Sequence, residues 1–280
     1  MNCPVCAAPS RATSTTKKTT QRYVVHVCTG CGLAFTMPRP TAAELDAFYT
    51  DTYFATDTEG LGYGDYRGAS WAEANARAMW SSLQSWASVE PPKKSVLDIG
   101  CATGAFLSEA KAAGWKVHGV EKAASAATIA EREFGVPVSN EVAAVAGDFG
   151  LITMWHVLEH LVDPLGALVA AKPKIAPGGY LFIELPQWGA LGRRKNGARW
   201  SQLRPPEHIN FFSKRSLRVA LETAGWQVLR QESIQPNVTN RAIELIRHGH
   251  AVKGSTLAVG ARVVERAGLG GYLRCLAAPR

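Results

Sequence analysis

The stretch SVLDIGCATGAF, residues 95–106, decides the fold of this 280-residue chain. Ser95–Ile99 has the short, apolar character of a buried strand, and Ala105–Ala113 has the spacing of a helix. Gly100 and Gly104 lie between them, at the carboxyl end of the strand, where open α/β sheets bind ligands. Glycine lets the backbone approach a ligand closely. The stretch therefore predicts a strand–turn–helix unit that holds a ligand at its turn.

Strands and helices alternate downstream of this unit. The predicted strands are residues 95–99, 116–121, 136–139, 149–155, 180–185, 226–234 and 272–277. The predicted helices are residues 105–113, 123–134, 164–174, 213–224, 240–250 and 256–267, and two more, residues 41–49 and 71–89, precede the unit. This alternation is typical of an α/β fold with a mostly parallel sheet covered by helices. We expect three parts: 1–40, 41–92 as a helical pre-domain or lid, and 93–280 as the α/β domain.

A carboxylate follows the turn at the sequence separation at which many nucleotide-binding folds place one for the ribose. Glu121 closes the second strand about 20 residues beyond the first glycine, where a carboxylate can accept hydrogen bonds from both hydroxyls of a ribose. The loop reads G-x-x-x-G, so the G-x-G-x-x-G pattern of dinucleotide-binding folds is absent. The alternative is a tight strand–turn–helix without a ligand.

Several motifs together resemble one family. VLDIGCATG, residues 96–104, resembles the first motif of the class I S-adenosylmethionine-dependent methyltransferases, and WHVLEHLVDP (155–164), APGG (176–179) and EHINFFSKRSL (207–217) resemble the same family. The likeness covers nearly the whole chain, including CGLAFTMPRP and ELDAFY near its start, and points to a bacterial subgroup with an N-terminal zinc ribbon. It implies a Rossmann-like methyltransferase fold with a mostly parallel seven-stranded sheet.

The resemblance also implies which residues bind S-adenosylmethionine. These are Asp98, Gly100, Ala102, Gly104, Phe106, Glu121, Lys122 and Trp155. The family usually has Phe-Asp at the start of the fourth strand, whereas this chain has Phe149-Gly150 with Asp148 displaced, so no role is carried over to Asp148.

Four cysteines near the start form two close pairs, Cys3-Pro-Val-Cys6 and Cys28-Thr-Gly-Cys31. Four thiolates at this spacing can surround one tetrahedral Zn²⁺ and leave no position open for catalysis. We therefore expect a structural zinc ribbon. Iron or two disulfides are the alternatives. Cys101 and Cys275 are expected to be buried small apolar residues.

Histidines are the candidate catalytic residues for methyl transfer to the acceptor. His156 and His208 are the candidate general bases for an acceptor that loses a proton, and the alternative for each is a hydrogen-bonded histidine that shapes a loop. His156-Val-Leu-Glu159-His160 also fits a zinc-peptidase pattern. That pattern belongs on a helix, whereas here it straddles a strand end, so we do not expect a peptidase.

The acceptor is expected to contact two groups of residues. Tyr63 and Tyr66 precede the α/β domain and can form a lid, or pack in the core. Gln187, Trp188, Arg193 and Arg194 lie on a long basic loop after the fifth strand. We expect this loop to bind an anionic group of the acceptor; a solvated basic surface is the alternative.

Composition narrows the class of function. The net charge is +8 without a run of five like charges, so nucleic acid is not the expected partner. No stretch of about 18 apolar residues is present to span a membrane, and Cys3 lies too near the start for a signal peptide. We expect a cytoplasmic methyltransferase acting on oxygen or carbon of a sugar, glycan precursor or secondary metabolite. The alternatives are a ribosomal RNA methyltransferase and a non-catalytic cofactor-binding scaffold. The sequence does not indicate the oligomeric state.

Overall fold

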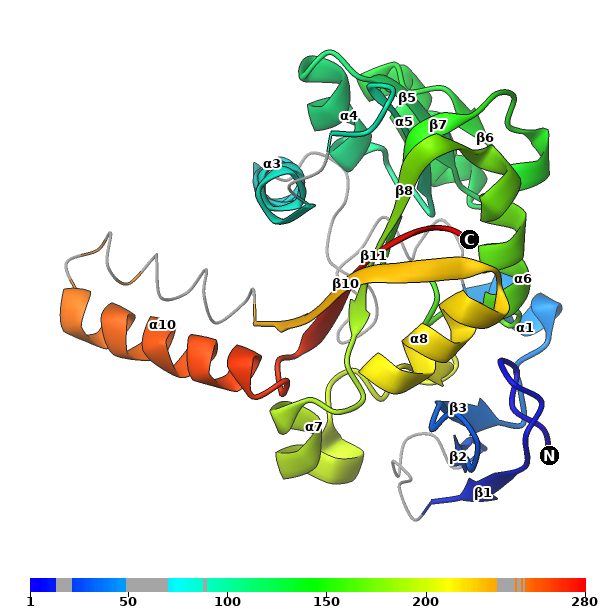
Figure 1. The fold of residues 1–280 in the computed structure, drawn as a ribbon, viewed down its shortest axis with the longest axis vertical. Coiled ribbons are helices and arrows are strands. Elements are labelled where there is room, and N and C mark those ends of the chain that lie inside the picture. The colour runs from blue at the N-terminus through cyan, green and yellow to red at the C-terminus, as the bar shows by residue number, and fades with distance from the viewer. Residues whose placement is uncertain (14–21, 49–69, 88–89, 236–244, 246–247, 249) are drawn as a thin grey trace.

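The computed structural model of the chain, drawn in Figure 1, describes residues 1–13, 22–48, 70–87, 90–235, 245, 248 and 250–280. Two parts of it carry the argument: a large central sheet and a small N-terminal sheet. The predicted helix 240–250 lies almost entirely outside the described residues.

The central sheet has seven strands in the order β10-β11-β8-β7-β4-β5-β6. Their bounds are β4 (Ser95–Ile99), β5 (Lys116–Val120), β6 (Val138–Ser139), β7 (Phe149–Trp155), β8 (Ile175–Pro186), β10 (Trp226–Ile234) and β11 (Tyr272–Pro279). The five strands from β8 to β6 run parallel, and β11 is antiparallel to both β8 and β10. The prediction of a mostly parallel seven-stranded sheet is confirmed.

Helices cover both faces of this sheet (Figure 1). Their bounds are α3 (Ser70–Ala87), α4 (Ala105–Ala112), α5 (Ala124–Phe134), α6 (Pro164–Ala171) and α8 (Lys214–Thr223). A further helix, α10 (Ala251–Arg266), projects away from the sheet (Figure 1). Because successive strand residues point to opposite faces, Leu151 and Trp155 join the apolar cluster under α3 and α4, whereas Ile152 and Met154 join the cluster under α6 and α8.

The small sheet lies beside the paired cysteines, of which Cys28 ends one of its strands. Its strands are β1 (Ser10–Ala12), β2 (Val24–Cys28), β3 (Ala34–Met37) and β9 (Asn210–Phe211), in that order. The fourth strand comes from the distant α/β part of the chain and pairs with β3. Helix α1 (Ala42–Phe48) follows, and Thr41 and Glu44 cap its start reciprocally.

Some predicted elements differ from the structure. Strand β8 begins at Ile175, five residues before the predicted strand 180–185. Its register with β7 shifts near Gly150, where a Cβ would lie 2.1 Å from the Lys93 carbonyl oxygen, so this crowded irregularity requires glycine. The predicted long basic loop contains the short helix α7 (Leu191–Asn196) and a 3₁₀ turn.

Among the helices that the structure describes, none is long and apolar enough to cross a membrane.

Candidate active site and metal centre

The loop after β4 adopts left-handed backbone conformations, which glycine favours. Gly100, Ala102 and Gly104 all have positive φ, of 78°, 47° and 80°. Gly104 precedes α4 and has no side chain to cap it, so the first amide groups of that helix face the loop without a capping side chain. The loop therefore offers backbone N–H groups and a helix start, the arrangement that binds polar ligand groups.

Asp98 lies directly beneath this loop and is almost fully buried. The Thr153 hydroxyl donates a hydrogen bond of 2.6 Å to its Oδ1 atom. Burial raises the pKa of Asp98 to about 7, against the opposing effect of the Thr153 hydrogen bond. A cationic ligand group above the loop would stabilise the ionised carboxylate.

Glu121 connects the loop to the end of β5. Its Oε2 accepts a hydrogen bond of 3.0 Å from the Ala102 amide, and its Oε1 accepts one of 2.9 Å from the Ala123 amide. Burial raises the pKa of Glu121, and these amide hydrogen bonds oppose that shift. The carboxylate thus fixes the loop and retains further lone pairs for a ligand. Lys122 beside it is exposed.

Phe106 and Trp155 meet on the α4 face of the sheet. Their ring centroids are 5.3 Å apart, and Trp155 also lies 4.6 Å from Phe182. The indole Nε1 of Trp155 is buried without a hydrogen-bond partner among the described residues. Such orphaned donors are costly, so this atom at the carboxyl end of β7 is consistent with a polar ligand there.

His156 follows β7 with a positive φ of 55°. Its Nδ1 lies 3.2 Å from Glu159 Oε1, and its Nε2 lies 3.7 Å from Glu184 Oε1. Burial alone would lower the pKa of His156, but these two carboxylates raise it to about 10. A protonated imidazole has no lone pair to accept a proton, so this environment favours the alternative of a histidine that shapes the loop.

His208 packs against His160, with ring centroids 4.7 Å apart and the rings nearly perpendicular. It is fully buried, and its Nδ1 lies 2.9 Å from the Gln202 carbonyl oxygen. Burial, together with the neighbouring His160 and Arg204, places the pKa of His208 well below its ordinary value. The side chain of His208 is thus enclosed by the protein in this conformation.

The residues predicted to contact the acceptor lie in different environments. Gln187 is buried and donates to the Gly268 carbonyl oxygen at 2.8 Å, and Trp188 packs with Trp200 and Phe211 in an apolar cluster against the small sheet. Arg193 on α7 stacks over the Trp188 ring at 3.5 Å, whereas Arg194 is exposed. Tyr63 and Tyr66 lie outside the described residues. Their binding roles stay predictions.

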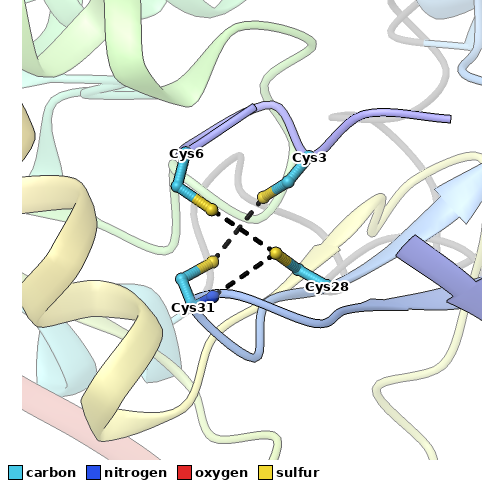
Figure 2. Close-up of side chains that lie close together, drawn as sticks. All are labelled: Cys3, Cys6, Cys28 and Cys31. Atoms are coloured by element: carbon cyan, nitrogen blue, oxygen red, sulfur yellow. Dashed lines mark hydrogen bonds between the residues drawn. The ribbon is translucent and has the colours of Figure 1, made fainter. Parts of the chain in front are cut away.

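The four ribbon cysteines converge, as Figure 2 shows. The sulfur atoms of Cys3 and Cys31 are 3.6 Å apart, and those of Cys6 and Cys28 are 3.4 Å apart. A tetrahedral zinc with bonds of about 2.3 Å separates its sulfur ligands by about 3.8 Å, close to these distances. The contact between Cys3 and Cys31 lowers the pKa of Cys3 and raises the pKa of Cys31. Cys101 and Cys275 are buried apart from this group, as expected.

Sequence reasoning missed the partners of His156. Glu184 on β8 accepts a hydrogen bond of 2.6 Å from Arg274 Nε on β11, and both side chains are buried. Burial would raise the pKa of Glu184, but its contacts with His156 and Arg274 lower it overall. The available signal was a lone glutamate inside the apolar strand YLFIEL.

Arg39 was missed as well. Its guanidinium donates hydrogen bonds to the Ile209 carbonyl (3.0 Å), to the Asn210 side chain (2.8 Å), and to the carbonyls of Leu161 (3.1 Å) and Val162 (2.8 Å). It therefore attaches the cysteine-bearing sheet to both segments that carry the buried histidines.

Displaced Asp148 makes an ion pair with Lys93 at the surface. It lies outside the groups described above.

Comparison with curated relatives gives partial matches. The chain is 37% identical over 100 residues to the ubiquinone biosynthesis O-methyltransferase of Aromatoleum aromaticum, which covers 32% of this chain and 43% of that protein. It is 38% identical over 101 residues to the protein of the same name from Ralstonia nicotianae, covering 32% and 42%. The chain thus spans less than half the length of the curated relatives it matches.

Solved structures share the fold. A SAM-dependent methyltransferase from Archaeoglobus fulgidus superposes with a TM-score of 0.52 at 19% identity, covering 76% of this chain and 95% of that one. The [4+2]-cyclase SpnF superposes with a TM-score of 0.50 at 22% identity, covering 75% and 82%. The fold therefore hosts more than one kind of chemistry. Residues 71–231, more than half of the chain, match the methyltransferase domain family, and the chain belongs to that family.

Proposed function

We propose that the chain is an S-adenosylmethionine-dependent methyltransferase that methylates an oxygen atom of a small-molecule acceptor. The loop from Gly100 to Gly104, fixed by Glu121 and followed by the uncapped start of α4, is the observation that supports it most strongly. The two curated relatives named above are both ubiquinone biosynthesis O-methyltransferases, which favours oxygen over carbon as the methylated atom.

The site fits such a cofactor. Glu121 can accept hydrogen bonds from the ribose hydroxyls, and Asp98 beneath the loop can balance the cationic amino-acid end. Trp155 contributes an orphaned indole N–H at the end of β7, and Phe106 covers the apolar side of the same face. These residues form the proposed cofactor pocket, together with Ala102 and Lys122.

When bound, S-adenosylmethionine supplies an electrophilic methyl carbon on a positively charged sulfur. The residues of this chain have to hold an acceptor oxygen in line with that carbon and exclude water. Trp155 and Phe182 pack at the carboxyl end of β7 and β8 and can exclude water there. His156 and His208 stay predictions for the uptake of the acceptor's proton.

The acceptor is proposed to carry an anionic group. Helix α7 presents Arg193, Arg194 and Lys195 in its last turn, and the Trp188 ring holds the Arg193 guanidinium in place. Titration with a sugar nucleotide tests the proposed anion binding by α7. The Arg193→Ala, Arg194→Ala double variant should bind the sugar nucleotide more weakly, and unchanged affinity would reject a role of these arginines in binding it.

We further propose that Cys3, Cys6, Cys28 and Cys31 bind a structural Zn²⁺. The spacing of the sulfur atoms supports it, as do the amides of Val5 and Gly30, which donate to the sulfurs of Cys3 and Cys28. Thiols persist in a reducing compartment, and we therefore propose the cytoplasm as the location.

The test is methyl transfer itself. The zinc-loaded protein should convert S-adenosylmethionine to S-adenosylhomocysteine when mixed with pools of small hydroxylated acceptors, and mass spectrometry should find the acceptor heavier by one methyl group. Tight cofactor binding without turnover on any pool would favour a non-catalytic scaffold. A dependence on added ribosomal RNA, steeply reduced by salt, would favour an RNA methyltransferase.

A further inference from the structure

A second group of metal-binding side chains lies inside the α/β part of the chain. Glu159, His160 and His208 each offer one ligand atom, and these atoms all lie within 4.8 Å of one another. Glu159 is 2% exposed and His208 is 0% exposed. The two segments that carry them are about 50 residues apart in sequence and are joined by backbone hydrogen bonds from Ile209 and Asn210 to the Glu159 carbonyl.

Both imidazoles are oriented as metal ligands are. His160 Nδ1 lies 2.9 Å from the Glu207 carbonyl oxygen, and His208 Nδ1 lies 2.9 Å from the Gln202 carbonyl oxygen. A carbonyl can only accept, so each Nδ1 carries the proton and each Nε2 carries a lone pair. A carbonyl partner at the second nitrogen is the usual support of a metal-bound histidine.

Glu159 supplies an independent observation. Its Oε2 atom is buried and has no hydrogen-bond partner among the described residues. Its other oxygen lies 3.2 Å from His156 Nδ1 and 3.9 Å from His160 Nε2. Leaving a buried carboxylate oxygen without a partner is costly, and a cation at the centre of the group would satisfy it.

One neighbouring cation competes for the same position. Arg204 Nη2 lies 3.4 Å from His208 Nε2 and 3.0 Å from Glu207 Oε1. Its side chain is 20% exposed, so it can move toward solvent. Ligands bonded to one ion at about 2.0–2.1 Å lie about 3.0–3.4 Å apart, so modest side-chain rotations would close the group.

We propose that Glu159, His160 and His208 form a second metal site, separate from the four cysteines. Two imidazoles and a carboxylate suit a divalent transition ion such as Zn²⁺, Co²⁺ or Fe²⁺. Three protein ligands leave at least one position open, as in catalytic zinc sites, and His156 beside it is partly exposed. An acceptor oxygen can bind at that position; this role rests on the proposed function, whereas metal binding itself does not.

The test is a titration of metal-free protein with Co²⁺. Cobalt bound to the cysteines shows thiolate charge-transfer absorption, whereas cobalt bound to nitrogen and oxygen does not, so the two sites are resolved in one experiment. Wild type should bind two equivalents per chain. His160→Ala should keep the thiolate signal and bind the second equivalent at least tenfold more weakly, the loss that removing even a supporting residue causes.

Controls separate folding from binding. His118→Ala removes a partly buried histidine on β5 that bonds Ser139, and it should keep both equivalents. Glu159→Gln keeps the shape of the side chain and should weaken the second equivalent, while Arg204→Ala should strengthen it by removing the competing cation. A single equivalent in wild type, or a second equivalent that His160→Ala and Glu159→Gln leave unchanged, would overturn the proposal. Calorimetry with S-adenosylhomocysteine on the same samples reports the cofactor site independently.

Discussion

Arg39→Ala should destabilise the protein by breaking the attachment between its two sheets. The wild-type guanidinium donates four hydrogen bonds of 2.8–3.1 Å, to three backbone carbonyls and to Asn210. Burial lowers the pKa of Arg39 to about 10, which leaves it charged at neutral pH. Alanine would leave these acceptors to water or without partners.

The size of the effect follows from these contacts. Hydrogen bonds to a charged group contribute about 1.5–3 kcal/mol each, and burying the charge costs several kcal/mol in return. We therefore expect a net loss of about 3–5 kcal/mol in the free energy of unfolding, the balance of four lost charge-assisted hydrogen bonds against the recovered cost of burying the guanidinium.

The assay is urea unfolding of the zinc-loaded protein, followed by tryptophan fluorescence, since Trp188 and Trp200 lie in the apolar cluster against the small sheet. Arg22→Ala is the matched control: Arg22 pairs with Glu44 at the surface, where water screens an ion pair and leaves it little effect on stability. A loss in Arg39→Ala no larger than in Arg22→Ala would refute the reasoning.

Three further predictions concern the loop, the buried aspartate and the cysteines. Gly100→Ala should cost more stability than Gly114→Ala. Both positions have positive φ, which costs alanine about 1–2 kcal/mol, but only at Gly100 would the new Cβ meet another atom, Val157 Cγ2 at 2.6 Å. Equal losses of stability in urea unfolding would contradict this steric argument. Burial raises the pKa of Asp98 to about 7, so the folded protein holds the proton of this carboxyl more tightly than the unfolded chain does. The contribution of that proton to the free energy of unfolding is therefore present at low pH and is lost as the pH rises through 7. The stability advantage of Asp98→Asn over wild type, without cofactor, should thus grow by about 1 kcal/mol between pH 6 and pH 8; a pH-independent difference would be evidence against it. Cys6→Ser should lose most of the thiolate absorption of the cobalt-loaded protein, whereas Cys101→Ser should keep it; the reverse would exclude the four-cysteine site.

Much of the fold was predictable because it follows from local patterns. The strands Phe149–Trp155 and Trp226–Ile234 have the predicted bounds, since continuous apolar or alternating runs define them. Ser213 caps α8 as its sequence indicates, by accepting a hydrogen bond from the Ser216 amide. Gly135 ends α5 in the left-handed conformation that favours glycine.

The contacts between distant segments were not predictable. Glu184 meets Arg274 because β8 and β11 pair in a particular antiparallel register, and nothing in either strand fixes that register alone. The pairing of β9 with β3 likewise depends on a two-residue strand, too short to show periodicity. For the same reason the sequence indicated His156 as a base but not the two carboxylates that surround it.

The central claim is that the loop from Gly100 to Gly104 and the carboxylate of Glu121 hold the adenosyl cofactor. Calorimetric titration of folded, zinc-loaded protein with S-adenosylhomocysteine tests it most directly. We expect one binding event per chain, weakened about tenfold or more in Glu121→Gln, since hydrogen bonds to a charged group contribute about 1.5–3 kcal/mol, and unchanged in the exposed-helix control Glu131→Gln. Absence of binding heat at several temperatures, with either S-adenosylhomocysteine or S-adenosylmethionine, would contradict the account.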